Sequence, residues 1–321
     1  MTDSGSIETI LDRRKLRRKV TFWRLTTIGV VVVALIAVAG RFSSATSHLT
    51  PHIARIEISG VITGDKDTLK LIKRVGASSE ARAVLVDIRS PGGTVTGAEH
   101  IYDELRRVSA KKPVVAVIDT LGASGGYIVA LGANRIVADD NALVGSIGVL
   151  FEFPNVSKLL DTVGIKVETI KSSPLKAAPN GFEPTSPAAR AAINSLVVDS
   201  YGWFKGLVKK RRNMTDAELA AVDDGRIFTG RQALKLKLVD QLGRERAAVA
   251  WLEKKKGVPK GLPIRDWKKK SAVGRFGIFS MASAAADALG LPQAAEFLSR
   301  VEKARDATAL DGLLAIWHVG A

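Results

Sequence analysis

The sequence predicts an α/β fold with a largely parallel sheet and flanking helices, preceded by one N-terminal transmembrane helix. Three observations lead to this prediction: apolar strand-like runs alternate with helix-compatible runs, glycine-rich turns follow strands, and an uncharged stretch follows a basic leader. Strands separated by helices of roughly 10–15 residues need crossover connections, which place successive strands parallel. A chain of 321 residues, 46% of them hydrophobic, can form one large α/β domain with appendages.

The N-terminal segment predicts a membrane anchor. Residues 1–21 are polar and then strongly basic, and the run Leu25–Gly40 carries no charge. As a helix this run spans roughly 24 Å, against a hydrocarbon core of about 30 Å, and the flanking Arg24 and Arg41 can snorkel outward. We therefore expect residues 1–21 to be a cytoplasmic tail and 22–41 an anchor. A cleaved signal peptide is the alternative, and either reading exports everything after the segment.

The following elements come from hydrophobic periodicity and turn signals. After a linker at 42–52, the sequence predicts strands at 53–58, 83–88, 114–118 and 135–138, and helices at 67–75, 95–110, 127–133 and 187–210. Ser186-Pro187 is typical of a helix start, and Thr215 to Glu218 fits a capping box. Basic loops near Lys254 and Lys268 are expected to end the compact domain. Residues 257–321 are then a helical extension, with helices at 276–289 and 294–301 and an apolar tail at 313–317.

Composition excludes several classes of function. The net charge is +16, but its basic clusters lack interleaved aromatic residues and match no helix-turn-helix or zinc-finger pattern. The chain has no cysteine, which removes a thiol nucleophile, disulfides and thiolate metal sites. Its four histidines show no metal-ligand spacing on one element. The sequence therefore predicts no nucleic-acid partner, no metal and no cofactor.

A small-residue turn after the strand 114–118 predicts an active site. It contains Ser124, Gly125 and Gly126, and it leaves a hydroxyl accessible at a strand-to-helix junction. A second glycine turn, with Gly93, follows the strand 83–88. Turns after adjacent parallel strands lie at the same sheet edge, so the N–H groups of Gly93 and Gly125 can point at one oxygen, as an oxyanion hole requires. A packing turn without catalytic role is the alternative for this stretch.

A nucleophilic serine needs a base, because its hydroxyl reacts poorly at neutral pH. No histidine lies between Ser124 and His318, and His100 is the sole imidazole near the first glycine turn. His100 has the pattern of an ordinary surface or packing residue. A lysine is therefore a serious candidate for the base.

Five motifs, in order, resemble the bacterial signal peptide peptidase A family. They are Ser90-Pro-Gly-Gly93, Gly122-Ala-Ser-Gly-Gly-Tyr127, Val144-Gly-Ser-Ile-Gly-Val149, Lys171-Ser-Ser-Pro-Leu-Lys176 and Gly225-Arg-Ile-Phe-Thr-Gly-Arg231. The resemblance covers roughly residues 53–255 and implies a peptidase domain at 53–256. It implies a fold shared with crotonases and Clp peptidases, one copy of the peptidase unit, and a bacterial inner-membrane protein whose peptidase domain lies outside the cytoplasm.

The resemblance also implies roles for individual residues. Ser124 is then the nucleophile and Lys176 the general base, with Gly93 and Gly125 at the oxyanion-hole positions and Ser146 in a supporting, lysine-orienting role. Lys171 is the competing lysine, although it matches the position that opens the family's motif. A free lysine is protonated at neutral pH, so this mechanism requires burial that destabilises the ammonium. Where Clp-type peptidases carry a histidine, this chain has apolar residues and glycine, which favours the lysine mechanism.

The implied function is a serine endopeptidase that cleaves remnant signal peptides and other membrane-proximal or unfolded peptides. The resemblance further implies a ring-like homo-oligomer in which neighbouring subunits share active sites. A crotonase-type acyl-CoA enzyme is one alternative, disfavoured by the anchor and by the lack of a carboxylate at either glycine turn. A catalytically silent membrane scaffold is the other, disfavoured by the presence of both Ser124 and Lys176.

Overall fold

The computed structural model describes residues 23–24, 27–28, 49–269 and 314–316. Contacts divide the chain into two units, Met1–Pro51 and His52–Ala321. In the first unit the described positions 23–24 and 27–28 are helical, and the hydroxyl of Thr27 donates to the carbonyl of Trp23 at 2.8 Å. Most of the expected anchor, 22–41, lies outside the described residues. Within the described part of the chain, no helix has the length and apolar character needed to cross a bilayer.

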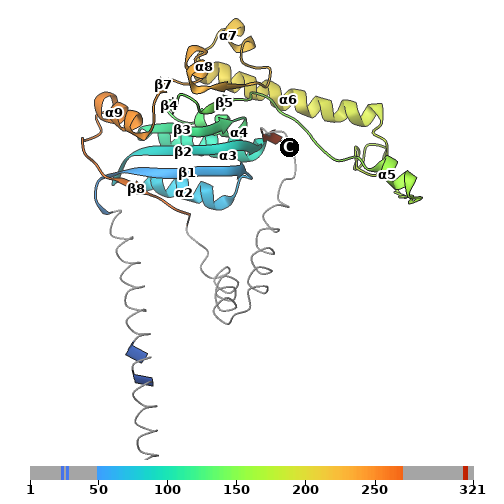
Figure 1. Cartoon of the computed structure of the whole chain (residues 1–321), viewed down its shortest axis with the longest axis horizontal. Helices are drawn as coiled ribbons and strands as arrows, with labels where there is room; N and C mark the ends of the chain where they lie inside the picture. Colours follow the sequence, from blue (N-terminus) through green and yellow to red (C-terminus); the bar gives the residue numbers. More distant parts are fainter. Residues whose placement is uncertain (1–22, 25–26, 29–48, 270–313, 317–321) are drawn as a thin grey trace, which may run out of the picture. The chain divides into compact units, whose positions relative to one another are not determined.

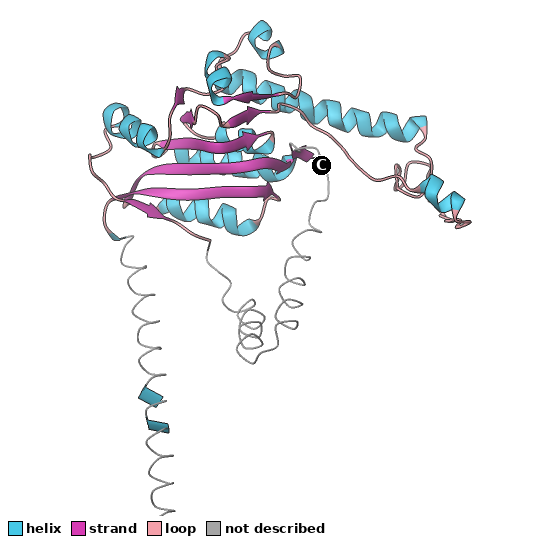
Figure 2. Ribbon diagram, viewed as in Figure 1, coloured by secondary structure: helices cyan, strands magenta, loops and turns pink. Residues whose placement is uncertain are grey.

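A sheet forms the centre of the second unit (Figure 2), and it has nine strands within the part of the chain that the structure describes. Its main path runs β6-β5-β3-β2-β1-β8, while β4 pairs with β3 and β7, and β9 pairs with β2. The strands are β1 His52–Ile62, β2 Ala81–Thr94, β3 Val114–Ala123, β4 Arg135–Ala138, β5 Leu143–Gly145, β6 Ile227–Thr229, β7 Gln241–Leu242, β8 Ile264–Asp266 and β9 Leu314–Ile316. Pairs β1–β2 and β2–β3 are parallel, whereas β5–β6 and β2–β9 are antiparallel.

Helices cover both faces of this sheet (Figure 1). They are α2 Lys66–Ala77, α3 Val95–Ser109, α4 Gly125–Ala130, α5 Ser157–Thr162, α6 Pro187–Arg212, α7 Asp216–Ala220, α8 Gly230–Lys235 and α9 Glu245–Lys256. The larger core joins β1 to β3 with α2, α3 and α4, and a smaller core joins the other face of these strands with α9. The predicted α/β fold with a largely parallel sheet and flanking helices is confirmed, and this arrangement fits the expected Clp/crotonase-like architecture.

Local sequence explains why the central elements form. The residues of β3 from Val114 to Ile118 are all buried, because the strand is covered on both faces, and they read as a continuous apolar run. Asp65 caps α2 by accepting from the N–H groups of Asp67 and Thr68, and Ser186 caps α6 by accepting from that of Ala189. The capping box predicted at Thr215 and Glu218 begins α7.

The compact unit extends beyond the basic segment near Lys254, where the sequence predicts that the domain ends. Lys254–Lys256 form the last turn of α9 rather than a loop. Positive charges at this end of a helix stabilise it by interacting with the helix dipole. Beyond it, β8 adds to the sheet by parallel pairing with β1, and Arg55 of β1 bonds Asp266 of β8. The helices expected at 276–289 and 294–301 lie outside the described residues.

Residues 151–186, named here the arm, leave the compact part between β5 and α6. The arm contains α5, and none of the residues of α5 is buried. Figure 1 shows the arm and the first turns of α6 extending away from the sheet. Several large apolar side chains of the arm and of α6 are exposed: Leu159, Val163, Ile165, Val167, Ile170, Leu175, Phe182, Leu196 and Val198.

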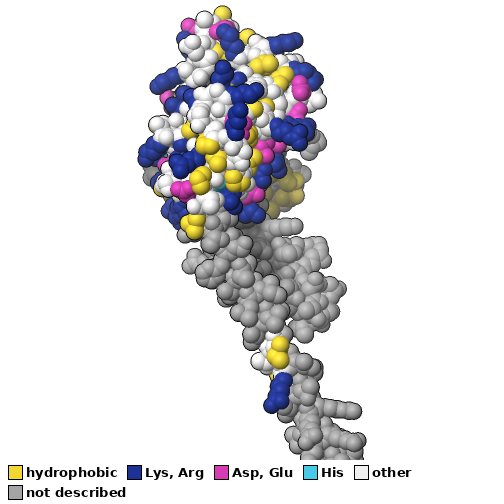
Figure 3. Space-filling model, turned by 90° about the vertical axis from the view of Figure 1, so that its left-hand side faces the viewer, with side chains coloured by type: hydrophobic (Ala, Val, Ile, Leu, Met, Phe, Trp, Pro, Cys, Tyr) yellow, Lys and Arg dark blue, Asp and Glu magenta, His cyan; other side chains and the backbone are white. Residues whose placement is uncertain are grey.

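Basic side chains are dispersed over the surface of the second unit. On the face that Figure 3 shows, Lys and Arg lie among acidic and hydrophobic side chains. Basic side chains of the second unit also form ion pairs, such as Arg107 with Glu104 at 2.8 Å and Lys205 with Asp223 at 3.4 Å.

Candidate active site

Ser124 lies at the sharp junction between β3 and α4. Its backbone adopts φ 53° and ψ −118°, a conformation that L-residues rarely take. The N–H of Ser124 donates to the carbonyl of Gly145 at 2.7 Å, and its carbonyl accepts from the N–H groups of Tyr127 and Ile128. The surrounding strands and helix therefore hold the strained turn in place, as a nucleophile elbow requires.

The hydroxyl of Ser124 is buried and unpaired. The residue is 1% exposed, and its Oγ has no hydrogen-bond partner among the described residues. A buried hydroxyl without a partner costs free energy, so such a group calls for an explanation. If Ser124 is catalytic, its hydroxyl gains a partner when the substrate or a second chain binds.

The helix after Ser124 is anchored deep in the core. All six residues of α4 are buried, and the hydroxyl of Tyr127 donates to the carbonyl of Leu238 at 2.7 Å. Burial raises the pKa of the Tyr127 hydroxyl, which therefore stays protonated and keeps donating. Gly125 is the first residue of this helix, and the first four N–H groups of a helix have no acceptor within it.

The end of β2 approaches the Ser124 turn closely. A Cβ added to Gly126 would lie 2.7 Å from the carbonyl oxygen of Ser90, so only glycine fits where α4 meets β2. A Cβ at Gly93 would lie 2.0 Å from the carbonyl oxygen of Ile62 on β1. The hydroxyl of Ser90 donates to the carbonyl of Gly60 at 2.7 Å and accepts from the N–H of Gly92 at 3.1 Å. These contacts bring the two predicted glycine turns to one sheet edge.

Ser146 lies beside the same turn. It follows Gly145, whose carbonyl binds the Ser124 N–H, and it is 7% exposed with a left-handed φ of 52°. Its own N–H donates to the carbonyl of Arg226 at 2.8 Å. An adjacent hollow of about 430 Å³ has apolar walls, among them Val149, Leu150, Val197, Val198 and Tyr201. No motif of the sequence indicates this hollow, because its walls come from segments far apart in the chain.

Lys176 is not brought to Ser124 within one chain. It is an exposed residue of the arm, and its N–H donates to the carbonyl of Ser173 at 3.1 Å. The burial that a lysine base requires is therefore not supplied by the chain to which this lysine belongs. Ser124, Gly125 and Ser146 lie at the adjoining ends of β3, α4 and β5, and Gly93 lies at the end of β2, a strand that contacts α4, whereas the expected base is exposed on the arm.

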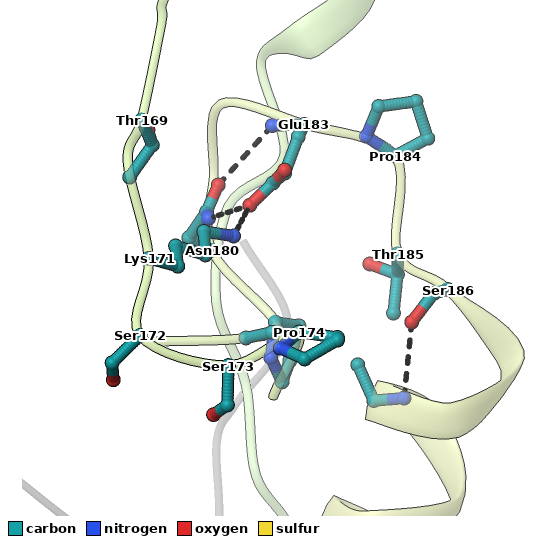
Figure 4. Close-up of a pocket in the computed structure, with 13 residues that line it drawn as sticks. Thr169, Lys171, Ser172, Ser173, Pro174, Asn180, Glu183, Pro184, Thr185 and Ser186 are labelled. Carbon is teal, nitrogen blue, oxygen red and sulfur yellow. Dashed lines mark hydrogen bonds and ion pairs between the residues drawn. The ribbon is translucent and has the colours of Figure 1, made fainter. Parts of the chain in front are cut away.

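Lys171 is engaged elsewhere in the arm. It forms an ion pair with Glu183, and the amide of Asn180 bonds the same carboxylate. These hydrogen bonds, that from Lys171 first, lower the pKa of Glu183. Figure 4 shows the three side chains converging above a cavity of about 550 Å³. Lys171 thus has a structural partner and is a weaker candidate for the base than Lys176.

The two imidazoles among the described residues take no part in this site. His100 is exposed on α3. His52 is buried at the start of β1, where its ring stacks on Trp267 and its Nε2 accepts from the Trp267 Nε1–H at 3.0 Å. Within the described ranges, no group of three or more His, Cys, Asp or Glu residues is placed to hold a metal ion.

Comparison with known proteins identifies the family. The sequence pattern of peptidase family S49 matches residues 106–259. A protein of Synechocystis sp. named as a protease is 41% identical over 201 residues, which cover 62% of this chain and 72% of that protein. A protein of Enterococcus faecium named as a signal peptide peptidase is 30% identical, over 64% of this chain and 63% of that protein.

Among solved structures, a mutant of a membrane-bound stomatin-specific protease aligns with a TM-score of 0.43 and 16% identity, over 68% of this chain and 98% of that one. The match to the family pattern includes Ser124, Ser146 and Lys176. This chain therefore belongs to peptidase family S49, a family of serine-type peptidases.

Proposed function

We propose that this chain is a membrane-anchored serine endopeptidase that works by a Ser124–Lys176 dyad on remnant signal peptides and other membrane-proximal or unfolded peptides. One observation carries the proposal: the Ser124 hydroxyl is buried, with no partner among the residues that the structure describes, on a strained turn beside the glycine-bearing end of β2. The E. faecium relative named as a signal peptide peptidase supports the substrate class. The basic leader and uncharged run before residue 41 support the anchor and an inner-membrane location.

The geometry suits acyl transfer. Ser124 Oγ attacks the scissile carbonyl and passes its proton to the lysine amine, which returns it to the leaving amine. The N–H groups of Gly93 and Gly125 stabilise the tetrahedral oxyanion, and removal of one such donor typically costs about 10²–10³ in kcat. Water then hydrolyses the acyl-enzyme by the reverse sequence.

The lysine comes from a neighbouring copy of the chain in this proposal. Lys176 is exposed on an arm that extends away from the sheet, whereas Ser124 is buried in the compact part. The arm and the exposed face of α6 also present large apolar side chains, including Ile165, Ile170 and Leu196. A surface of this kind favours association, and a ring of copies would bury both the apolar side chains and the lysine.

Subunit mixing tests the shared site. Full-length Ser124→Ala and Lys176→Ala chains, each inactive alone, are co-expressed with different tags and purified through both. Recovery of peptide hydrolysis in the mixed assembly is the expected result, because some sites then pair an intact serine with an intact lysine. Lys171→Ala serves as the matched control and keeps activity.

Two outcomes contradict parts of the proposal. An active Lys176→Ala enzyme would remove the lysine as base. Mixed assemblies that form but stay inactive would place both residues of the dyad in one chain, after a rearrangement of the arm.

A further inference from the structure

We propose that Ser90 is a positioning residue of the oxyanion hole, because its hydroxyl ties together a bulge of β2 and so fixes the turn that carries Gly93. The inference rests on the proposed function, since that function makes the Gly93 N–H an oxyanion donor. It begins from an irregularity in the sheet, where β2 runs between β1 and β3.

The pairing of β2 with β1 shifts by one residue just before the glycine turn. Ser59 pairs with Arg89, and the next pair is Val61 with Gly92. Two steps along β1 therefore correspond to three steps along β2, so β2 carries one extra residue, as in a β-bulge. Bulges are rare between parallel strands and are over-represented next to active sites, where they change the direction in which the groups of a strand point.

The pairing of β2 with β3 is irregular at the same place. Ile88 pairs with Ile118, and the next pair is Ser90 with Gly122, so that four steps along β3 correspond to two along β2. Beyond this pair, β3 turns into Ser124 and α4. The irregularities on the two sides of β2 therefore flank Ser90, directly beside the nucleophile turn.

The Ser90 hydroxyl supplies hydrogen bonds at this irregular point. It donates to the carbonyl of Gly60 on β1 at 2.7 Å and accepts from the N–H of Gly92 at 3.1 Å. A third contact, with the carbonyl of Gly92, is longer at 3.4 Å. Gly60 is the β1 residue that the register shift skips, and Ser90 is 0% exposed, so water does not replace these bonds. One side chain thus links the β1 backbone to the residue before Gly93.

Glycine at both ends of this link makes the hydroxyl necessary. Gly60 has φ 70° and Gly92 has φ 109°. Glycine adopts such values without the penalty of a Cβ, but it also leaves them easily, because it has more conformational freedom than any other residue. The bonds of the Ser90 hydroxyl therefore restrain a backbone that its own residues leave free.

The backbone of Ser90 contacts the helix that carries the other proposed donor. A Cβ added to Gly126 would lie 2.7 Å from the Ser90 carbonyl oxygen, so α4 packs directly on this residue. The helix begins with Gly125, whose N–H is the second proposed donor. An oxyanion hole works when both donors lie within hydrogen-bond distance of one oxygen. Ser90 touches the segments of both donors, so it helps to set the distance between them.

Steady-state hydrolysis of a fluorogenic peptide by the full chain tests the proposal. Ser90→Ala removes the hydroxyl, so the Gly93 N–H shifts, and kcat should fall about 10–10²-fold. KM should stay within about twofold, because the donors act on the transition state rather than on the bound substrate. Thr68→Val on α2 is the matched control: it also removes a buried hydroxyl, one that donates to Asp65 at 2.6 Å. It should lower the Tm about as much as Ser90→Ala and keep kcat.

A peptide aldehyde reports on the oxyanion hole more directly. Addition of Ser124 Oγ to its carbonyl carbon moves the carbonyl π electrons onto the oxygen that the hole binds, and the hydroxyl proton passes to the base. The inhibition constant of the aldehyde should rise by the same factor as kcat falls in Ser90→Ala. In the Ser124→Ala background, a fluorescent peptide should bind with equal Kd, by anisotropy, whether or not Ser90→Ala is present.

The outcomes separate this inference from the peptidase function. A folded Ser90→Ala enzyme with the kcat and aldehyde affinity of wild type would overturn the positioning role and keep the peptidase. Equal losses of kcat in Ser90→Ala and Thr68→Val would overturn it too, by tracing the loss to stability. A wild-type chain that neither cleaves peptides nor binds the aldehyde would overturn the peptidase and, with it, this inference. If Ser90→Ala does not fold, Ser90→Cys decides, because its thiol fills the space but bonds weakly and should give an intermediate kcat.

Discussion

Substitution of Gly93 by alanine should remove one oxyanion donor while leaving the nucleophile intact. A Cβ at this position would lie 2.0 Å from the carbonyl oxygen of Ile62, 2.5 Å from its nitrogen and 2.6 Å from its carbonyl carbon. All three are backbone atoms of β1, so no side chain can rotate away. The end of β2 must therefore separate from β1, and the N–H of residue 93 moves with it.

The size of the effect follows from this displacement. Real Cβ contacts essentially never fall below 3.0 Å. A shift of about 1 Å at a catalytic group can cost about 10²-fold in rate, and loss of an oxyanion donor costs about 10²–10³ in kcat. We expect the kcat of Gly93→Ala to fall about 10²–10³-fold.

The assay is steady-state peptide hydrolysis by the full chain, with folding checked by circular dichroism and thermal unfolding. Gly202→Ala on α6 is the matched control, because a Cβ there meets nothing within 4 Å. It should keep full activity. A folded Gly93→Ala enzyme with a kcat within about threefold of wild type would refute the oxyanion assignment, since the donor it removes is worth far more.

Three further substitutions test the site and its support. Ser124→Gly should abolish activity, because it removes the nucleophile. It should also raise the free energy of unfolding by about 1 kcal/mol in urea titration, because glycine adopts φ 53° without strain. An unchanged free energy of unfolding would argue against a strained turn. Tyr127→Phe should cost about 1–2 kcal/mol of stability, because it leaves the buried carbonyl of Leu238 unpaired; a neutral effect would mean that this bond does not anchor α4. Burial raises the pKa of Asp87 above its usual value, although Arg89 opposes the shift. The folded state therefore holds this proton more tightly than the unfolded state, so the ionised carboxyl opposes folding as pH rises through its folded pKa. Asp87→Asn should raise the Tm near neutral pH and leave it unchanged at about pH 3, where the carboxyl is protonated in both states. An equal shift at both pH values would contradict this account.

Local signals were sufficient for the central layers of the fold. The apolar run of β3, the amphipathic pattern of α3 and the caps at Ser186 and Thr215 each depend on a few neighbouring residues. Alternation of such elements predicts crossovers and hence a parallel sheet. Ser124 and Gly93 were also singled out from sequence, because strand-to-turn junctions in a parallel sheet share one edge.

The short strands β8 and β9 could not be predicted from local sequence, because they form by pairing with strands that are distant in the chain. β8 and β9 are three residues each, and a run of that length has no periodicity that distinguishes a strand from a loop or a helix end. The sequence predicted the end of the domain in the region of β8 and an apolar tail in the region of β9. Their pairing with β1 and β2 follows from edges that exist only once the sheet has formed.

By itself, the sequence determined the α/β class, the order of the central strands and helices, the position of Ser124 and the motifs that carry the family resemblance. Tertiary structure alone decided that Gly93 packs against the Ile62 backbone, that no residue in the described ranges pairs with the buried Ser124 hydroxyl, and that Lys176 is exposed on the arm. Hydrophobic periodicity and helix caps depend on residues that are neighbours in the sequence. Burial, close approach and edge pairing are set by segments that meet only after the chain has folded, and they cannot be read from either segment alone.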